Sequence, residues 1–338
     1  MIPRLFLAGL STAMIFLVFR LCIMLDNKDT AVIASFLTSL YPPFVYFSAG
    51  LVTQLPFTFL FLLLLFFWIR FDAHPSVFQG ILIGLLSGIT LLTRADILFL
   101  LPLLFCITFI KHGRKMVMLW IPLCFIIAVS PWVVRNYMVH GKVFLVPPKG
   151  GRNLWESNNY KFSNQFAGGE HPEELQLYDS IRKTELEHLK RKDLIEFPKF
   201  QDEDEITRDE ILMGRVISFI RANPIVYMKL CLIRLKETFR IFPRQLSGLK
   251  VKLIALFTDG WILPLSIIGF FLTIKQLSKF WIIHIASIYH VGIHILTTSG
   301  ISQRIPVMPI FLIYTSIVIR KIWISGIRNN STGKVNEL

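Results

Sequence analysis

The sequence predicts an all-α integral membrane protein, a polytopic bundle of about nine spans with one large external loop region of short helices. Three observations lead to this fold class. Of the 338 residues, 54% are hydrophobic and only 17% are charged, whereas about 25% are charged in an ordinary soluble domain. Apolar runs long enough to cross a bilayer recur along the chain. The basic residues sit at the edges of those runs, as in membrane proteins.

The net charge of +14 suits a membrane protein, but it would also suit a nucleic-acid binder. The distribution of Lys and Arg decides between the two classes, because these residues form no basic stripe. Membrane lipids are therefore expected as partners and nucleic acid is not. The four cysteines (Cys22, Cys106, Cys124 and Cys231) offer neither a disulfide framework nor a paired-cysteine metal motif.

Each span needs about 20 predominantly apolar residues. The runs that meet this need cover residues 4–25, 30–49, 51–69, 78–94, 96–111, 115–134, 251–274, 279–298 and 304–322. The first run is too long for a signal-peptide core and lacks a small-residue cleavage site, so we interpret it as a span. Four regions result: an N-terminal bundle at 1–135, a loop region at 136–250, C-terminal spans at 251–322 and a cytoplasmic tail at 323–338.

The short basic loops set the predicted orientation. Lys111–Lys115 is the most basic of them, followed by Lys275 with Lys279 and by the residues after the last span. Counting spans places all of them on one side, which the excess of Lys and Arg assigns to the cytoplasm. Residues 136–250 then lie outside a membrane that we expect to be the bacterial inner membrane. The N-terminus also lies outside, which is unusual without a preceding start signal.

Residues 136–250 are polar, and they carry 16 of the 22 acidic residues of the chain. A helix is predicted from about 205 to 221, ending before Asn223-Pro224. The next stretch, Ile225–Phe242, mixes basic and apolar side chains. That mixture suits a helix in the headgroup plane that binds anionic lipid, and equally a solvated helix packed on the bundle.

Polar side chains at the outer ends of the spans are the candidates for binding a lipid-linked substrate. Tyr41 precedes a proline pair that interrupts backbone hydrogen bonding. The break either lines a wet cavity or is a kink in a helix that serves packing alone. Arg94 can bind phosphate through its planar fork, or it can pair with Asp96 and hold a turn. Arg304 can also face phosphate, or extend to the interface.

A second group of candidates follows the sixth predicted span. Arg135 and Asn136 begin the external segment, and Asn153 and Trp155 follow a glycine pair. Asn amides suit sugar hydroxyls, and Trp either stacks on sugar rings or lies at the membrane interface. Each residue alone is what a surface loop would supply; together they predict a headgroup-binding surface.

In their order along the chain, these residues resemble the motifs of bacterial GT-C glycosyltransferases, a class similar to protein O-mannosyltransferases and the lipid A aminoarabinose transferase. The resemblance covers residues 1 to about 320. It implies a transferase that passes a sugar from a polyprenyl-phosphate donor to an acceptor at the outer membrane face. The motifs are Tyr41-Pro42-Pro43…Tyr46…Ser48-Ala49-Gly50-Leu51…Thr53, Leu92-Thr93-Arg94…Asp96…Leu101-Pro102, Pro131-Trp132…Arg135-Asn136, Gly151…Asn153-Leu154-Trp155…Asn158 and Arg304…Pro306…Pro309.

The departures from this family concern carboxylates. Gln54 stands where the family commonly has Glu, and the family's first span, with its acidic external loop, has no counterpart before Met1. We therefore expect a truncated chain that transfers sugar weakly or not at all. Its catalytic residue is unknown, with Asp96 the weak candidate. The resemblance allows a divalent cation, but His290 and His294 lack a third ligand, so no metal site is predicted.

Two other function classes stay open. A non-catalytic membrane subunit that binds lipid is favoured by the missing carboxylates. A transporter of polyprenyl lipids would carry charges at the midplane of several spans and often internal repeats, and the sequence pattern shows neither.

Overall fold

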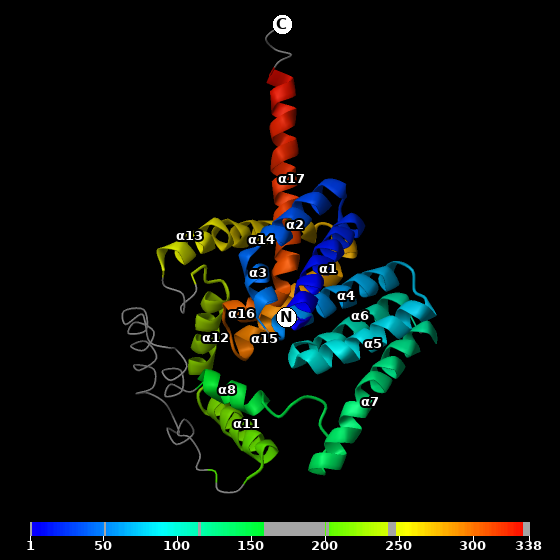
Figure 1. Ribbon diagram of the computed structural model, residues 1–338, viewed down its shortest axis with the longest axis vertical. Helices are drawn as coiled ribbons and strands as arrows, with labels where there is room; N and C mark the ends of the chain where they lie inside the picture. Colours follow the sequence, from blue (N-terminus) through cyan, green and yellow to red (C-terminus); the bar gives the residue numbers. More distant parts are fainter. Residues whose placement is uncertain are drawn as a thin grey trace. The chain divides into compact units, whose positions relative to one another are not determined.

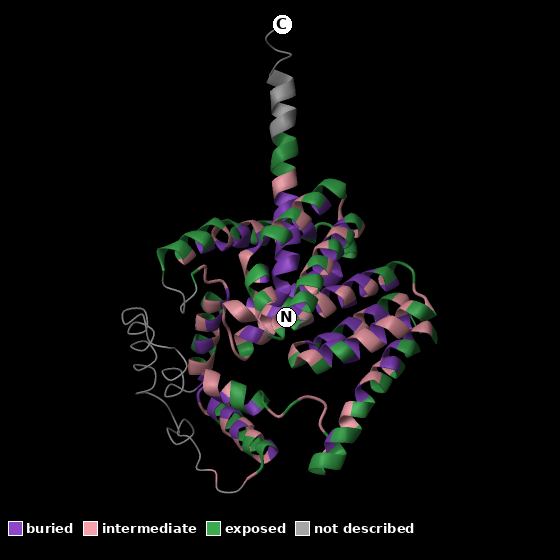
Figure 2. Cartoon of the chain, in the orientation of Figure 1, coloured by how far each residue is buried: buried purple, intermediate pink, exposed green. Residues whose placement is uncertain are grey.

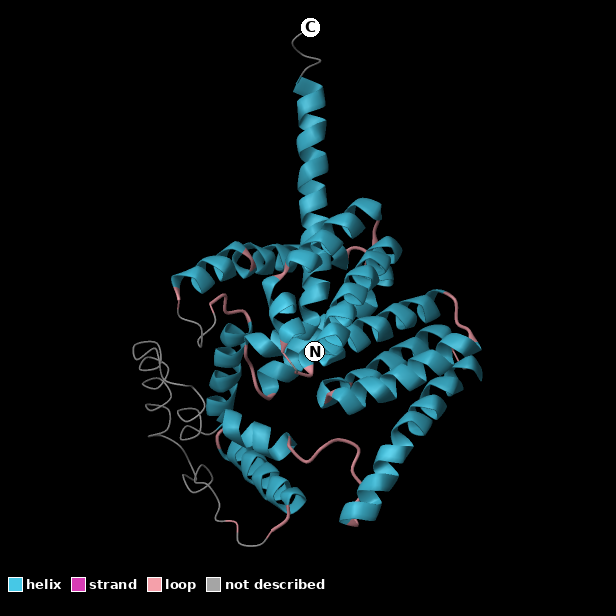
Figure 3. Cartoon of the chain, viewed as in Figure 1, coloured by secondary structure: helices cyan, strands magenta, loops and turns pink. Residues whose placement is uncertain are grey.

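The computed structural model describes residues 2–50, 52–113, 116–158, 200, 203–242 and 248–333, with backbone alone for residue 2 and for 326–333. Every regular element in these ranges is a helix, so the predicted all-α class is confirmed for them (Figure 3). The chain divides into two compact units. The first comprises Met1–Arg135, Leu256–His290 and Arg304–Leu338, and the second comprises Asn136–Ala255 and Val291–Gln303.

The first unit contains most of the apolar helices (Figure 1). They are α1 (Ile2–Leu25), α2 (Lys28–Leu40), α3 (Pro42–Ala49), α4 (Gln54–Ala73), α5 (Val77–Thr93), η1 (Ala95–Ile97), α6 (Leu100–His112), η2 (Met116–Leu119), most of α7 (Trp120–His140), α14 (Asp259–Ile274), most of α15 (Leu277–Leu296), η4 (Ile305–Val307) and α17 (Met308–Gly333). The second unit contains α8 (Gly150–Asn158), α11 (Glu205–Ala222), α12 (Pro224–Thr238), most of α13 (Leu249–Phe257), the end of α15 and most of α16 (Ile301–Arg304).

Within the described ranges, seven helical segments are long and apolar enough to cross a membrane. They match seven of the predicted spans and make this an integral membrane protein by length and composition. The predicted span 78–94 forms α5, which at 17 residues is a shorter apolar helix. The predicted span 30–49 is two helices, α2 and α3, bent by 49°. Counting that pair and a second bent pair, α11 with α12 at 106°, gives up to nine spans.

The helix α17 is the central helix of the first unit. Every residue from 304 to 318 is buried, and the helix packs against α14 and α2 (Figure 2). A helix that is apolar all round belongs in such an interior. By contrast, only 22% of the most apolar stretch of the segment Met116–His140 is buried. The apolar side chains that this peripheral helix exposes are suited to face lipid.

A glycine stripe sets the close packing of α5 on α7. A Cβ added at Gly84 would lie 2.5 Å from the carbonyl oxygen of Ile121, and one at Gly88 would lie 2.5 Å from the Cβ of Ala128. Small residues at four-residue spacing let two membrane helices approach closely. The glycine stripe of α5 therefore determines which face of the helix packs on α7.

Candidate functional site

A carboxylate buried in the first unit binds side chains from two other segments. The Tyr41 hydroxyl donates to Asp259 Oδ1 at 2.8 Å, and Arg304 Nη2 donates to Asp259 Oδ2 at 2.5 Å. The three residues are only 1%, 4% and 1% exposed, in the order Tyr41, Asp259, Arg304. We call this group the Asp259 cluster. It joins segments that lie more than 200 residues apart in the sequence.

Local chain breaks present these three side chains. Tyr41 has extended backbone (φ −70°, ψ 109°) because the proline after it disfavours helical geometry at the preceding residue. Asp259 begins α14 directly after the non-helical Thr258, where the helix dipole stabilises an acidic side chain. Arg304 ends α16, and the short helix η4 follows it with Pro306 in its first turn. Each residue thus lies where one helix ends or another begins.

The position of the cluster within apolar segments makes it the candidate site. Asp259 and Arg304 belong to Leu249–Ile274 and Ile301–Ser325, two of the seven candidate spans. A charged residue in a membrane-spanning segment is costly, up to about 2.5–3.5 kcal/mol at the centre of the helix on insertion scales. Such residues persist where they pair with one another and where they serve a function. The sequence predicted Tyr41 and Arg304 as binding residues, and the structure brings both to one carboxylate.

A second polar pair, Arg94 with Asp96, lies in the turn between α5 and α6. Arg94 Nε donates to Asp96 Oδ2 at 2.7 Å, and the two side chains are 15% and 18% exposed. The Arg94 guanidinium carbon lies 5.6 Å from the ring centroid of Phe57, within cation–π range. Of the two roles left open by the sequence, this geometry shows the local pair. Phosphate binding by Arg94, and catalysis by Asp96, stay predictions.

Contacts around α4 show that Arg94 and the elements near Arg304 gather at one end of the helices. Arg94 lies over Phe57 in the first turn of α4, and Phe61 one turn later contacts His290 near the end of α15. The Phe99 amide, at the start of α6, donates to the Tyr289 hydroxyl at 3.2 Å. The η4 helix after Arg304 also packs on α4. We call this the Asp259 end.

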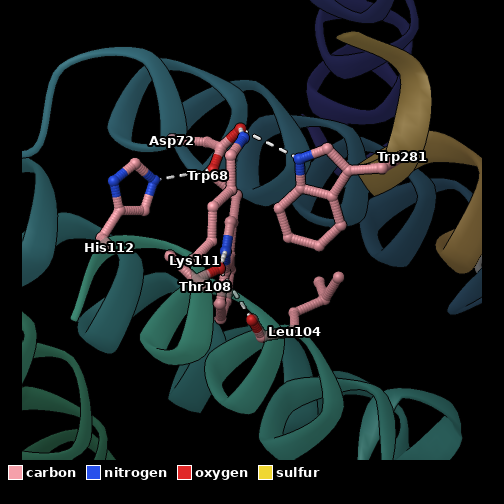
Figure 4. Close-up of polar contacts among 7 residues, drawn as sticks. All are labelled: Trp68, Asp72, Leu104, Thr108, Lys111, His112 and Trp281. Atoms are coloured by element: carbon pink, nitrogen blue, oxygen red, sulfur yellow. Dashed lines mark hydrogen bonds and ion pairs between the residues drawn. The ribbon is translucent and has the colours of Figure 1, made fainter. Parts of the chain in front are cut away.

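The opposite end of the same helices carries a different polar cluster, centred on Asp72 at the end of α4 (Figure 4). Lys111 Nζ and His112 Nε2 approach its two oxygens at 2.6 and 2.9 Å. Trp281 Nε1, from the start of α15, donates to Asp72 at 2.9 Å. One turn earlier, Trp68 Nε1 donates to Thr108. Lys111 belongs to the most basic short loop, so this is the end that the sequence assigns to the cytoplasm.

The candidates Arg135 and Asn136 do not lie at the start of a loop, because α7 continues to His140. Arg135 is exposed, and its guanidinium carbon lies 5.5 Å from the Trp132 ring centroid. Asn136 is fully buried, and its Nδ2 donates to the Phe144 carbonyl at 3.2 Å. This contact folds the chain back after α7. Joint binding of one headgroup by Arg135 and Arg304 stays a prediction.

The candidates Asn153 and Trp155 lie on α8 in the second unit. Trp155 is 3% exposed and packs in a cluster with Leu212 and Val216 of α11. Asn153 is exposed on the same helix. A Trp ring at this position packs α8 on α11, so its stacking on a sugar stays a prediction. Glu170–Glu196, which carries half of the acidic residues of this region, lies outside the described residues.

Two buried charged residues were not among the predicted site residues. Asp259 is the one acidic residue among the buried side chains of the described ranges, and the signal that could have found it was an acid inside an apolar run. Arg234 of α12 is 5% exposed and donates to Asn158 Oδ1 at 2.6 Å and to the Ser157 carbonyl at 3.0 Å. The amphipathic pattern of α12 gave no signal for that contact.

Among the described residues, no group of three or more His, Cys, Asp or Glu side chains is arranged to hold a metal ion. Comparison of the chain with models of protein families, with curated proteins and with solved structures finds no match.

Proposed function

We propose that this protein is a membrane glycosyltransferase of the GT-C type that binds a polyprenyl-phosphate-linked sugar at the Asp259 end of its helices. The observation that carries the proposal is the Asp259 cluster. Ionisable residues buried in membrane-spanning segments are costly and rare, and they are candidates for substrate sites and pathways by default. The ordered motifs that resemble this family supply the chemical class, because they include Tyr41, Arg94 and Arg304.

The reaction in this class needs positive charge for the departing phosphate and a base for the acceptor hydroxyl. Arg94 and Arg304 are the candidates for the first role. A guanidinium carries five N–H donors in a fixed plane, so it can hold a carboxylate and also face a second anion. In this arrangement Asp96 and Asp259 orient the two guanidinium groups toward the headgroup.

A second candidate function is a non-catalytic lipid-binding subunit. Both carboxylates near the proposed site, Asp96 and Asp259, are bound by an arginine, and Gln54 cannot accept a proton as a carboxylate does. Those contacts favour binding without transfer. The two functions share the lipid and differ in turnover, so one preparation can separate them.

The binding claim is tested by replacing Arg94 in the full chain, reconstituted in nanodiscs. Arg94→Gln should weaken binding of a polyprenyl phosphate about tenfold or more, because a hydrogen bond to a charged group is worth about 1.5–3 kcal/mol. The matched control is Arg70→Gln at the other end of α4, since Arg70 makes a similar cation–π contact, 5.7 Å from the Phe66 ring centroid. Binding can be followed by native mass spectrometry.

Equal loss in the two variants would assign binding to general charge attraction and contradict the proposal. No binding by the unaltered chain would contradict it as well. Release of free polyprenyl phosphate from a lipid-linked sugar, in the presence of a candidate acceptor, would favour the transferase. Binding without release would favour the subunit.

We also propose that the Asp259 end faces outward and the Asp72 end faces the cytoplasm, following the basic loops. In a background with the native cysteines replaced by Ala, Ser218→Cys on α11 and Lys279→Cys near the start of α15 each supply one exposed thiol. In the proposed orientation, the first lies outside the membrane and the second on the cytoplasmic side. An impermeant thiol reagent should label Ser218→Cys alone in intact cells. Labelling of Lys279→Cys alone, or of both, would contradict this orientation.

A further inference from the structure

The helix α12 has two opposite apolar faces, and one of them packs against other helices of the described part of the chain. On the packed face, Leu230 forms a cluster with Phe219 of α11, and Val226 and Ile233 pack against it. Arg234 lies on this same face and binds Asn158 and Ser157 of α8. These contacts fix the rotation of α12 about its axis. The opposite face therefore stays turned outward.

The outward face is a stripe of aliphatic side chains. Ile225, Met228, Leu232 and Leu235 are 69%, 66%, 66% and 39% exposed. Their spacing of three, four and three residues puts them on one side of a helix. The stripe is flanked by exposed Lys229 and Lys236. On a helical wheel of 100° per residue, both lysines fall beside the stripe and away from the packed face.

This composition identifies the surface that covers the stripe. Contiguous apolar patches on a soluble surface mark interaction sites. A helix with an apolar face beside basic residues lies in the plane of a membrane interface, with its apolar face at the acyl boundary. Each Lys close to an anionic leaflet contributes to this attraction. The same chain contains seven candidate membrane spans, so a bilayer surface is available to α12.

We propose that α12 docks on the membrane surface, with Ile225, Met228 and Leu232 at the acyl boundary and Lys229 and Lys236 against the phosphates of anionic lipids. Of the two alternatives that the sequence left open for this segment, the exposed stripe favours the helix in the headgroup plane. The proposal does not depend on the substrate bound at the Asp259 end.

A nitroxide label on the full chain tests this docking. In the background with the native cysteines replaced by Ala, Met228→Cys carries the label in the stripe, and Ser218→Cys on α11 is the matched exposed control. The chain is placed in nanodiscs of phosphatidylcholine with phosphatidylglycerol. The label at 228 should be accessible to oxygen, which partitions into lipid, and shielded from a water-soluble nickel chelate. The label at 218 should show the reverse.

The double change Lys229→Gln/Lys236→Gln should lower the ratio of docked to undocked helix about fivefold per lysine. The same loss should follow when phosphatidylglycerol is left out. Nickel accessibility at 228 equal to that at 218, in both lipid compositions, would overturn the proposal. Shielding of 228 from oxygen and nickel alike would also overturn it, because a protein surface would then cover the stripe, and dipolar coupling between labels would identify a second copy.

Discussion

At the scale of single residues, the site depends on partners that lie far apart in the sequence. Tyr41 and Arg304 could be singled out from the sequence because each stands beside prolines, Tyr41 within an apolar run and Arg304 at the start of one. Asp259 stands out in the sequence only as an acid inside an apolar run, and its partners become visible only when α14 lies next to Arg304. The Arg94–Asp96 contact was foreseen as one alternative, because residues two positions apart are neighbours in any fold.

The Asp259–Arg304 pair could hold the fold, bind the substrate or do both, and a pair of variants separates these roles. Asp259→Leu alone should destabilise the protein by about 3–5 kcal/mol, because it leaves a buried charge without its partner. The double variant Asp259→Leu/Arg304→Met should recover most of that loss, since an apolar pair of similar volume is often neutral. Thermal unfolding in nanodiscs measures both changes.

The binding assay completes this test. The double variant, which should be nearly as stable as the unaltered chain, should bind polyprenyl phosphate at least tenfold more weakly, given the strength of charged hydrogen bonds. Binding at full strength would show that the pair is structural. A double variant as unstable as the single one would show that the two residues do not act as a pair.

At the scale of elements, the apolar runs predicted the helices well and their breaks less well. The span at 51–69 became α4, whereas the span at 30–49 became two helices that meet at Tyr41. Hydropathy averages over about 20 residues, so it does not register a bend made by one proline pair. The helical course of α7 through Arg135 was missed for the opposite reason, because polar residues extend a helix without raising its hydropathy.

The glycine stripe of α5 gives a prediction at this scale. Gly84→Ala should destabilise the protein by about 1–3 kcal/mol, the range for overpacking, because the added Cβ would lie 2.7 Å from the Cβ of Cys124. The matched control is Gly9→Ala on α1, where nothing lies within 4 Å. There the change should be neutral or slightly stabilising, since Ala favours helices over Gly. Equal unfolding temperatures for the two variants would contradict close packing of α5 on α7.

At the scale of the whole molecule, the charged residues of the first unit separate into two ends of opposite predicted orientation. Lys111 and Lys279 mark the Asp72 end, while Arg94 marks the Asp259 end. The loop charges alone predicted this separation, because they follow insertion rules that do not depend on packing. Packing decides which residues meet within each end, and this is why the partner of Arg304 required the structure.

The most direct measurement is to map where a polyprenyl phosphate binds, using an analogue with a photoreactive group beside its phosphate. The full chain in nanodiscs is irradiated with this analogue, and crosslinked peptides are identified by mass spectrometry. Crosslinks should fall near Tyr41, Arg94 and Arg304, and excess unlabelled polyprenyl phosphate should suppress them. Crosslinks concentrated around Asp72, Lys111 and Trp281 instead, or spread evenly over the lipid-facing helices, would contradict a lipid-phosphate site at the Asp259 end.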